Sequence, residues 1–126
     1  DTRYIHNDYY CFYNGGRELS TIKLTEWLAL AAELGVGEVH LTCIDTEGTM
    51  NRFPLSLVEL ATSSTHLPII LSGGFRDAND IATIYNSFNI TAFSFSSLPN
   101  ILKTPTILLR QQLIDLDLPI RIPLAQ

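Results

Sequence analysis

The chain has 126 residues, 46% of them hydrophobic and 17% charged, which is enough to build the core of one globular domain and too apolar for disorder. Its net charge is −5 and it has no cluster of lysines or arginines, which argues against nucleic acid and membranes as main partners. No apolar stretch is long enough to span a bilayer, and the first residues do not resemble a signal peptide. We therefore expect a single cytoplasmic domain over residues 1–126.

The cysteines and histidines give no sign of a disulfide framework or a metal site. Cys11 and Cys43 are too few and too far apart in sequence for either, so we expect reduced thiols. His6, His40 and His66 lack the spacing of metal ligands. We expect neither a metal nor another cofactor.

The first half of the chain predicts a hairpin, a helix and a strand. Residues 8–14 are aromatic and β-prone and end at the turn Asn14-Gly15-Gly16, which indicates a hairpin or an extended loop. Apolar residues recur at helical spacing over residues 24–34, and Gly35 is a typical helix stop. Residues 38–45 alternate as a strand, with His40, Thr42 and Ile44 on one face and Val39, Leu41 and Cys43 on the other.

The second half continues as alternating helices and strands. Pro54 suits the first position of a helix through residue 63, and a short apolar strand follows His66-Leu67-Pro68. Asp77 is a good N-cap for the next helix. Residues 91–97 form a strand, with small side chains on one face and two phenylalanines on the other, and Thr104-Pro105 opens the last helix.

The most informative motif is Ser72-Gly73-Gly74, at the end of an apolar strand and before a capped helix. Adjacent glycines let the backbone approach a ligand closely and present free N–H groups, and phosphate is the usual ligand at such turns. The end of the next strand, at Phe95 and Ser96, supplies further donors at the same edge. We favour a shared anion site over a tight turn that binds nothing.

Three βα units after a hairpin predict an α/β fold with parallel strands. A closed TIM (βα)8 barrel needs eight strands and about 250 residues, so this chain corresponds to about half of one. Open parallel edges and an uncovered sheet face need covering, by a missing N-terminal half or by a second copy of the chain.

Several blocks of sequence resemble one enzyme family, the cyclase subunits of imidazole glycerol phosphate synthase in histidine biosynthesis, or a close paralogue. The similarity is to the C-terminal half of these proteins and covers almost the whole chain. The matching blocks are YNGG at residues 13–16, LTCIDTEGT at 41–49, LPII at 67–70, SGG at 72–74 and the strand from residue 92 to 97.

This resemblance implies a (βα)8 barrel of two related halves, each with a phosphate site. Family members use ammonia from a partner glutaminase to cyclise a phosphoribulosyl-formimino ribonucleotide, a lyase-type reaction. Two aspartates act as acid and base, and Asp1 matches the one in the C-terminal half. The phosphate contacts implied for this chain come from Ser72, Gly73, Gly74, Phe95 and Ser96.

The resemblance also implies substrate contacts near the strand of residues 38–45. Thr42 would line the barrel interior, while Asp45, Glu47 and Gly48 would form a turn that contacts substrate hydroxyls. Asp45 is equally suited to capping its own loop through its side chain.

The sequence departs from the family at several positions. Glu47 replaces an aspartate, Arg3 replaces a lysine, Phe95 replaces a small residue, and Arg52 and Pro54 stand where the family has a glycine and an acid. Three functions therefore stay open. The chain is part of a cyclase, inactive without an N-terminal half; or part of a paralogue that works with a glutaminase-like partner on another phosphorylated or sugar substrate; or a non-catalytic phosphate-binding half barrel that self-associates.

Overall fold

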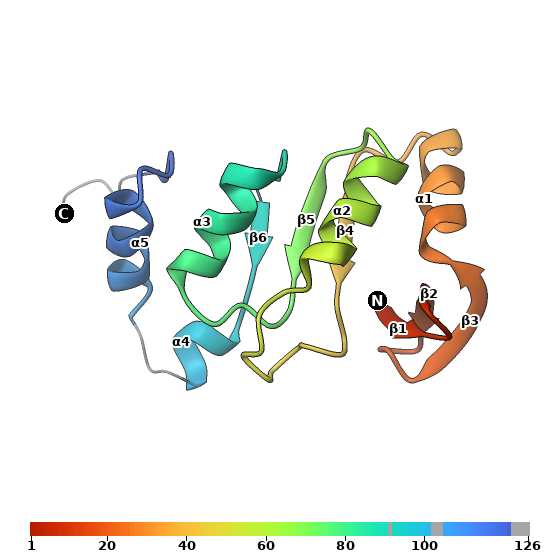
Figure 1. Ribbon diagram of the computed structural model, residues 1–126, viewed down its shortest axis with the longest axis horizontal. Helices are drawn as coiled ribbons and strands as arrows, with labels where there is room; N and C mark the ends of the chain where they lie inside the picture. The colour runs from red at the N-terminus through yellow and green to blue at the C-terminus, as the bar shows by residue number, and fades with distance from the viewer. Residues whose placement is uncertain (91, 102–104, 122–126) are drawn as a thin grey trace.

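The structure, a computed structural model, describes residues 1–90, 92–101 and 105–121 (Figure 1). Two sheets of three strands each make up its β structure, one antiparallel and one parallel. Thr91, Thr104 and the end of the proline-rich tail, residues 122–126, lie outside the described residues. No helix in the described ranges is both long and apolar enough to cross a membrane.

The antiparallel sheet contains β1 (Thr2–Ile5), β2 (Asp8–Tyr13) and β3 (Glu18–Lys23), in that order. Between β1 and β2, His6 and Asn7 have φ angles of 50° and 62°, as in a two-residue hairpin turn that matches the twist of the strands. The predicted hairpin at residues 8–14 is confirmed as β2 and its turn into β3. The bounds of its partner strand β3 were not predicted, and β1 was not predicted at all.

The parallel sheet has the order β4-β5-β6, with β4 (Val39–Thr42), β5 (Ile69–Ser72) and β6 (Ala92–Ser94). The prediction of parallel βα units is therefore confirmed. The strand predicted over residues 91–97 was too long, because β6 ends at Ser94 and Ser97 already begins a short helix.

The first strand also touches the parallel sheet. Thr2 pairs with Cys43 in a parallel bridge, and the Ile44 N–H donates to the Thr2 carbonyl at 3.0 Å. The Thr2 hydroxyl donates to the Thr42 carbonyl at 3.3 Å. The start of β1 therefore lies beside the end of β4 and continues the parallel order by one more strand.

Four of the five helices follow the positions predicted from the sequence. The Asp77 side chain accepts the Asp80 N–H at 3.0 Å and caps its helix as expected. Gly35 ends the first helix at a φ of +74°, where its N–H donates to the Ala32 carbonyl at 3.1 Å. The short fourth helix was not predicted. The helices are α1 (Leu24–Glu33), α2 (Leu55–Ser64), α3 (Ala78–Ser87), α4 (Ser97–Ile101) and α5 (Thr106–Asp115).

One face of the parallel sheet is buried and the other is open. Leu41 and Leu71 are at most 2% exposed and share one core with apolar residues of α1, α2 and α3. The opposite face carries Thr42, Ser72 and Ser94, which are half-buried and directly in register across the three strands. Three hydroxyl side chains therefore lie in a row at the carboxyl end of the uncovered face. The sequence alternation predicted this face for Thr42 and Ser94.

The turn after β5 packs tightly against the turn after β4. A Cβ atom added at Gly74 would lie 2.5 Å from the Thr46 Cβ, and one added at Gly73 would lie 2.8 Å from the Cys43 carbonyl oxygen. Just beyond them, the ring of Phe75 stacks on Phe53 at a centroid distance of 5.5 Å. Because only glycine leaves room for this approach, the two loops form one packed unit at the carboxyl edge of the sheet.

This packing predicts different costs for the same substitution at two glycines. Gly48 and Gly74 have φ angles of +72° and +76°, but only Gly74 has a neighbour within 4 Å of the added Cβ. Gly48→Ala should therefore cost about 1–2 kcal/mol of unfolding free energy for the left-handed backbone alone. Gly74→Ala should cost about 1–3 kcal/mol more because of overpacking. Chemical denaturation of both variants tests this, and equal costs would contradict the close packing.

Candidate functional site

The carboxyl ends of β4, β5 and β6 meet at one edge of the sheet, the lower edge in Figure 1. Three segments leave the strands there: the loop of residues 43–54, the turn of residues 72–74 and the link into α4. We call the first the 43–54 loop and the second the SGG turn. In parallel α/β structures, ligands bind at this edge.

The SGG turn presents backbone donors. Gly73 and Gly74 are buried residues with φ angles of +107° and +76°. Within the described part of the chain, neither their N–H groups nor that of Ser96 donates a hydrogen bond. Buried N–H groups are usually paired, so those at the SGG turn are candidates for binding an acceptor from outside the chain.

The residues after β6 lie next to this turn. Ser72 is in register with Ser94, so Gly73 and Gly74 follow β5 at the level where Phe95 and Ser96 follow β6. Phe95 is half-buried, and Ser96 is exposed at the edge. The residues predicted to bind an anion therefore follow two neighbouring strands at the same edge of the sheet.

The carboxylate of Asp45 is engaged inside the chain. One of its oxygens accepts the Tyr4 N–H at 2.9 Å, and the other pairs with the Arg3 Nε at 2.8 Å. The Arg3 guanidinium also lies over the Phe12 ring, 5.4 Å from its centroid. Asp45 thus fastens β1 to the end of β4, and its contacts differ from the capping of its own loop that the sequence suggested.

The rest of the 43–54 loop is held by its own hydrogen bonds. The N–H groups of Thr46 and Glu47 donate to the Cys43 carbonyl at 3.3 and 3.1 Å. The Glu47 side chain lies beside Gly73, with an oxygen 3.0 Å from the position of an added Cβ, and Gly48 is exposed at the tip. Glu47 is therefore the carboxylate nearest to the SGG turn among the predicted site residues.

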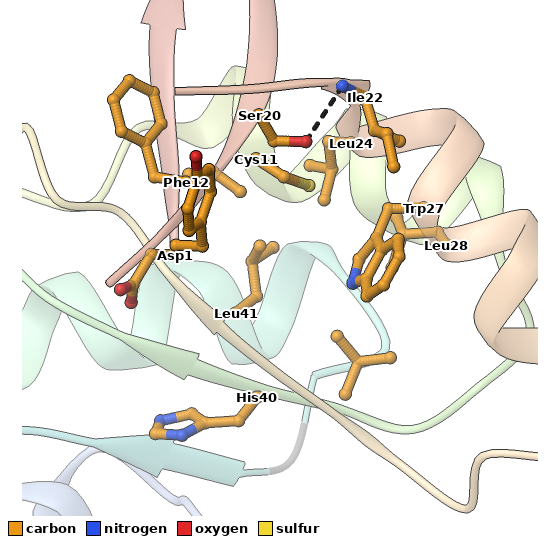
Figure 2. A pocket seen from close by; sticks show the side chains of 13 residues that line it. Asp1, Cys11, Phe12, Ser20, Ile22, Leu24, Trp27, Leu28, His40 and Leu41 are labelled. Atoms are coloured by element: carbon orange, nitrogen blue, oxygen red, sulfur yellow. Dashed lines mark hydrogen bonds between the residues drawn. The ribbon is translucent and has the colours of Figure 1, made fainter. Parts of the chain in front are cut away.

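Asp1 lies at the mouth of a different hollow (Figure 2). This hollow, about 260 Å³ in volume, lies between the antiparallel strands, α1 and β4, and is lined mainly by apolar side chains such as those of Trp27 and Leu41. Burial raises the pKa of the Cys11 thiol on its wall, which disfavours the thiolate. The pairing of Thr2 with Cys43 puts Asp1 at the level of Thr42, so Asp1 belongs to the same carboxyl edge.

Tyr9 anchors the hairpin that carries Asp1. Its side chain is 6% exposed, and its hydroxyl shares a hydrogen bond of 3.0 Å with the Ser56 hydroxyl. Burial raises the pKa of this phenol, so it stays neutral and available for that hydrogen bond. The hairpin is thus attached to the first turn of α2 as well as to β4.

Sequence reasoning missed a charged cluster at the same edge. Asp80, only 7% exposed, pairs with the Arg52 Nε at 3.1 Å and lies 3.9 Å from the Arg76 Nη2. The one local signal for Asp80 was its place in the first turn of α3, three positions after the cap. Arg52 comes from the 43–54 loop and is far from Asp80 in sequence, so no local pattern connects them.

No group of three or more histidine, cysteine or acidic side chains in the described ranges is arranged to hold a metal ion. The site therefore offers backbone N–H groups, hydroxyls and carboxylates. These groups can bind an anion and transfer protons.

The chain is similar to curated proteins named imidazole glycerol phosphate synthase subunit HisF. It is 31% identical to that of Prochlorococcus marinus subsp. pastoris over 116 residues, 92% of this chain and 46% of the relative. It is 37% identical to that of Bacillus cereus over 93 residues, 73% of this chain and 37% of the relative. The HisF of Sulfolobus acidocaldarius is 37% identical over 84 residues, 67% of this chain and 34% of the relative. The chain thus spans less than half the length of these relatives.

A family profile described as histidine biosynthesis protein matches residues 1–93, which include β1 to β5 and the SGG turn. The similarity expected from the motifs is therefore confirmed. Since the match covers most of the chain, the chain belongs to this histidine biosynthesis family, with relatives among the HisF cyclase subunits.

Proposed function

We propose that this chain is the phosphate-binding C-terminal half of a cyclase-type (βα)8 barrel. The observation that carries the proposal is that, within the described residues, the N–H groups of Gly73 and Gly74 donate no hydrogen bond, and that they follow β5, the strand paired with β6. Free N–H groups at a strand-to-helix turn are a recurrent phosphate site, and in TIM barrels it forms on the last two strands. Ser72, Ser96 and the backbone at Phe95 complete the cradle.

The rest of the barrel comes from a missing N-terminal half. The uncovered sheet face and the hollow beside Asp1 support this, because a parallel sheet is normally covered on both faces. Exposed apolar side chains lie on both outer helices, with Trp27 at 47% on α1 and Ile107 at 69% on α5. A second hollow, of about 470 Å³, lies between β6, α3 and α5. A covering half would bury these surfaces.

The proposed reaction is the cyclisation of a phosphoribulosyl-formimino ribonucleotide with ammonia from a glutaminase partner. Asp1 transfers a proton on one side of the barrel, and a carboxylate of the other half acts opposite to it. The SGG turn holds one substrate phosphate, which fixes the reacting groups in place. Thr42, Glu47 and Gly48 line the path from that phosphate toward Asp1, and Asp45 holds β1 in position.

A paralogue that acts on another phosphorylated or sugar substrate is the second candidate. The 43–54 loop supports it, because Arg52 is bound to Asp80 and Pro54 is the N-cap of α2. Two positions where the resembling family has a glycine and an acid thus serve other purposes in this chain. The phosphate cradle is common to both candidates.

Inorganic phosphate should bind the purified chain saturably, and Ser96→Asp should weaken its binding at least about tenfold. A carboxylate placed a few ångströms from the anion repels it by about 1–4 kcal/mol. Ser87→Asp is the matched control, since Ser87 is exposed at the far end of α3. Calorimetry measures both. A folded chain that binds no phosphate, or equal effects of the two variants, would overturn the phosphate site.

The open surfaces predict association. A chain of 14.1 kDa should form a one-to-one complex when mixed with the N-terminal half of a HisF relative, because that half covers both outer helices. Sedimentation of the chain alone and of the mixture measures this. Burial of Cys11 in the complex should also slow its reaction with a thiol reagent. If the chain forms a stable homodimer and does not bind the added half, the self-associating, non-catalytic alternative is favoured.

In the reassembled barrel, Asp1→Asn should lower kcat about 10²–10⁴-fold with ammonium salt as nitrogen source, since positioned proton transfer contributes about that much. Asp117→Asn is the control, because Asp117 is exposed at the end of α5 with a φ of +61°, which asparagine tolerates. Product formation from the formimino ribonucleotide is the readout. Phosphate binding without any turnover of this substrate would favour the paralogue.

A further inference from the structure

We propose that Arg52 is a positioning residue: its ion pair with Asp80 fastens the 43–54 loop to the first turn of α3, beside the SGG turn. The pair joins the Arg52 Nε to an Asp80 carboxylate oxygen at 3.1 Å. Arg52 precedes α2, and Asp80 lies three positions after the cap of α3. The contact therefore links two loops that leave neighbouring strands.

The backbone of the loop is strained at this point. Arg52 has a φ of +67° and Met50 one of +57°, a region that side chains other than glycine, asparagine and aspartate seldom occupy. Such strain persists only where surrounding contacts hold it, and it tends to occur at functional loops. An arginine is therefore present here despite its backbone cost, which indicates a role for its side chain.

Asp80 gives that side chain a defined partner. Its carboxylate is 7% exposed and already accepts the Arg76 N–H at 3.0 Å, while the Arg76 guanidinium lies farther away, at 3.9 Å. A buried carboxylate is costly unless it is paired and hydrogen-bonded. Arg52 lies closer to this carboxylate than the Arg76 guanidinium does, so it supplies most of the charge pairing. The same ion pair holds the Arg52 side chain in place.

The other contacts between the two loops belong to the core. Phe53, 2% exposed, stacks on Phe75, and Thr46 packs on Gly74. The Arg52 side chain is 62% exposed, so it can be replaced without opening a cavity. We therefore expect the Arg52–Asp80 ion pair to control how often the 43–54 loop opens, while the core contacts keep the fold intact.

Hydrogen exchange of the full chain tests this. The reporters are the amides of Thr46, Glu47 and Thr49, which donate to carbonyls inside the loop. Arg52→Gln keeps the backbone angle and removes the charge, so these amides should exchange about tenfold faster as the loop opens more often. Amides of β5 and α3 should be unchanged.

Arg76→Gln is the matched control. It also removes a positive charge near Asp80, but Arg76 lies in the β5–α3 connection and carries no part of the 43–54 loop. Its effect on the loop amides should be less than twofold. Arg52→Lys should restore most of the protection, because an ammonium can also pair with Asp80. Equal effects of Arg52→Gln and Arg76→Gln would overturn the proposal.

Asp80→Asn provides the reciprocal test, since the amide oxygen still accepts the Arg76 N–H while the charge is lost. It should speed loop exchange as much as Arg52→Gln does, and the double variant should show no further increase. Additive effects would mean that Arg52 acts through another partner.

One consequence rests on the proposed function: a fastened loop keeps Glu47 and Gly48 in place to contact the substrate hydroxyls. Arg52→Gln should then change the affinity of the reassembled barrel for the ribonucleotide more than its affinity for inorganic phosphate. Because loop exchange is measured without any ligand, a failure of the ion pair is distinguished from a failure of the phosphate site.

Discussion

The close approach of two βα turns is the constraint on which the carboxyl edge of this protein depends. Gly73 and Gly74 lie so near to Cys43 and Thr46 that any side chain at either glycine collides with the neighbouring turn. The same left-handed backbone that permits this contact leaves the Gly73 and Gly74 N–H groups without an acceptor among the residues that the structure describes. Close packing and the proposed anion binding both require residues without a side chain here, because each brings the backbone close to another group.

The antiparallel hairpin extends that edge toward Asp1. Its first strand, β1, is tied to β4 by the pairing of Thr2 with Cys43 and by Asp45, which binds Arg3 and the Tyr4 N–H. Tyr9 of β2 attaches the hairpin to α2. These contacts are polar and directional, so they fix the position of a strand that has few apolar residues of its own. Asp1 precedes β1 and the SGG turn follows β5, and both strands are joined to β4. The two are consequently held in fixed positions relative to each other.

The parallel sheet has one buried face and one open face. Helices α1, α2 and α3 cover one face of the parallel sheet with a shared apolar core, while the hydroxyl row of Thr42, Ser72 and Ser94 ends the uncovered face. The outer helices α1 and α5 carry exposed apolar residues, and one hollow lies beside β4 and another beside β6. Exposed apolar surface of this extent is typical of an interaction site.

Helices α1, α2, α3 and α5, the βα order, the cap at Asp77 and the turn glycines could be predicted from the sequence, because each depends on residues within a few positions of one another. Sequence reasoning overestimated the last strand and missed α4, since a three-residue strand and a one-turn helix carry too little periodic signal. Only the tertiary structure decided the ion pair of Arg52 with Asp80, the engagement of Asp45 by Arg3, and the fit of Gly74 against Thr46. These contacts join residues distant in sequence, and their energy depends on distance and burial, which no local pattern encodes.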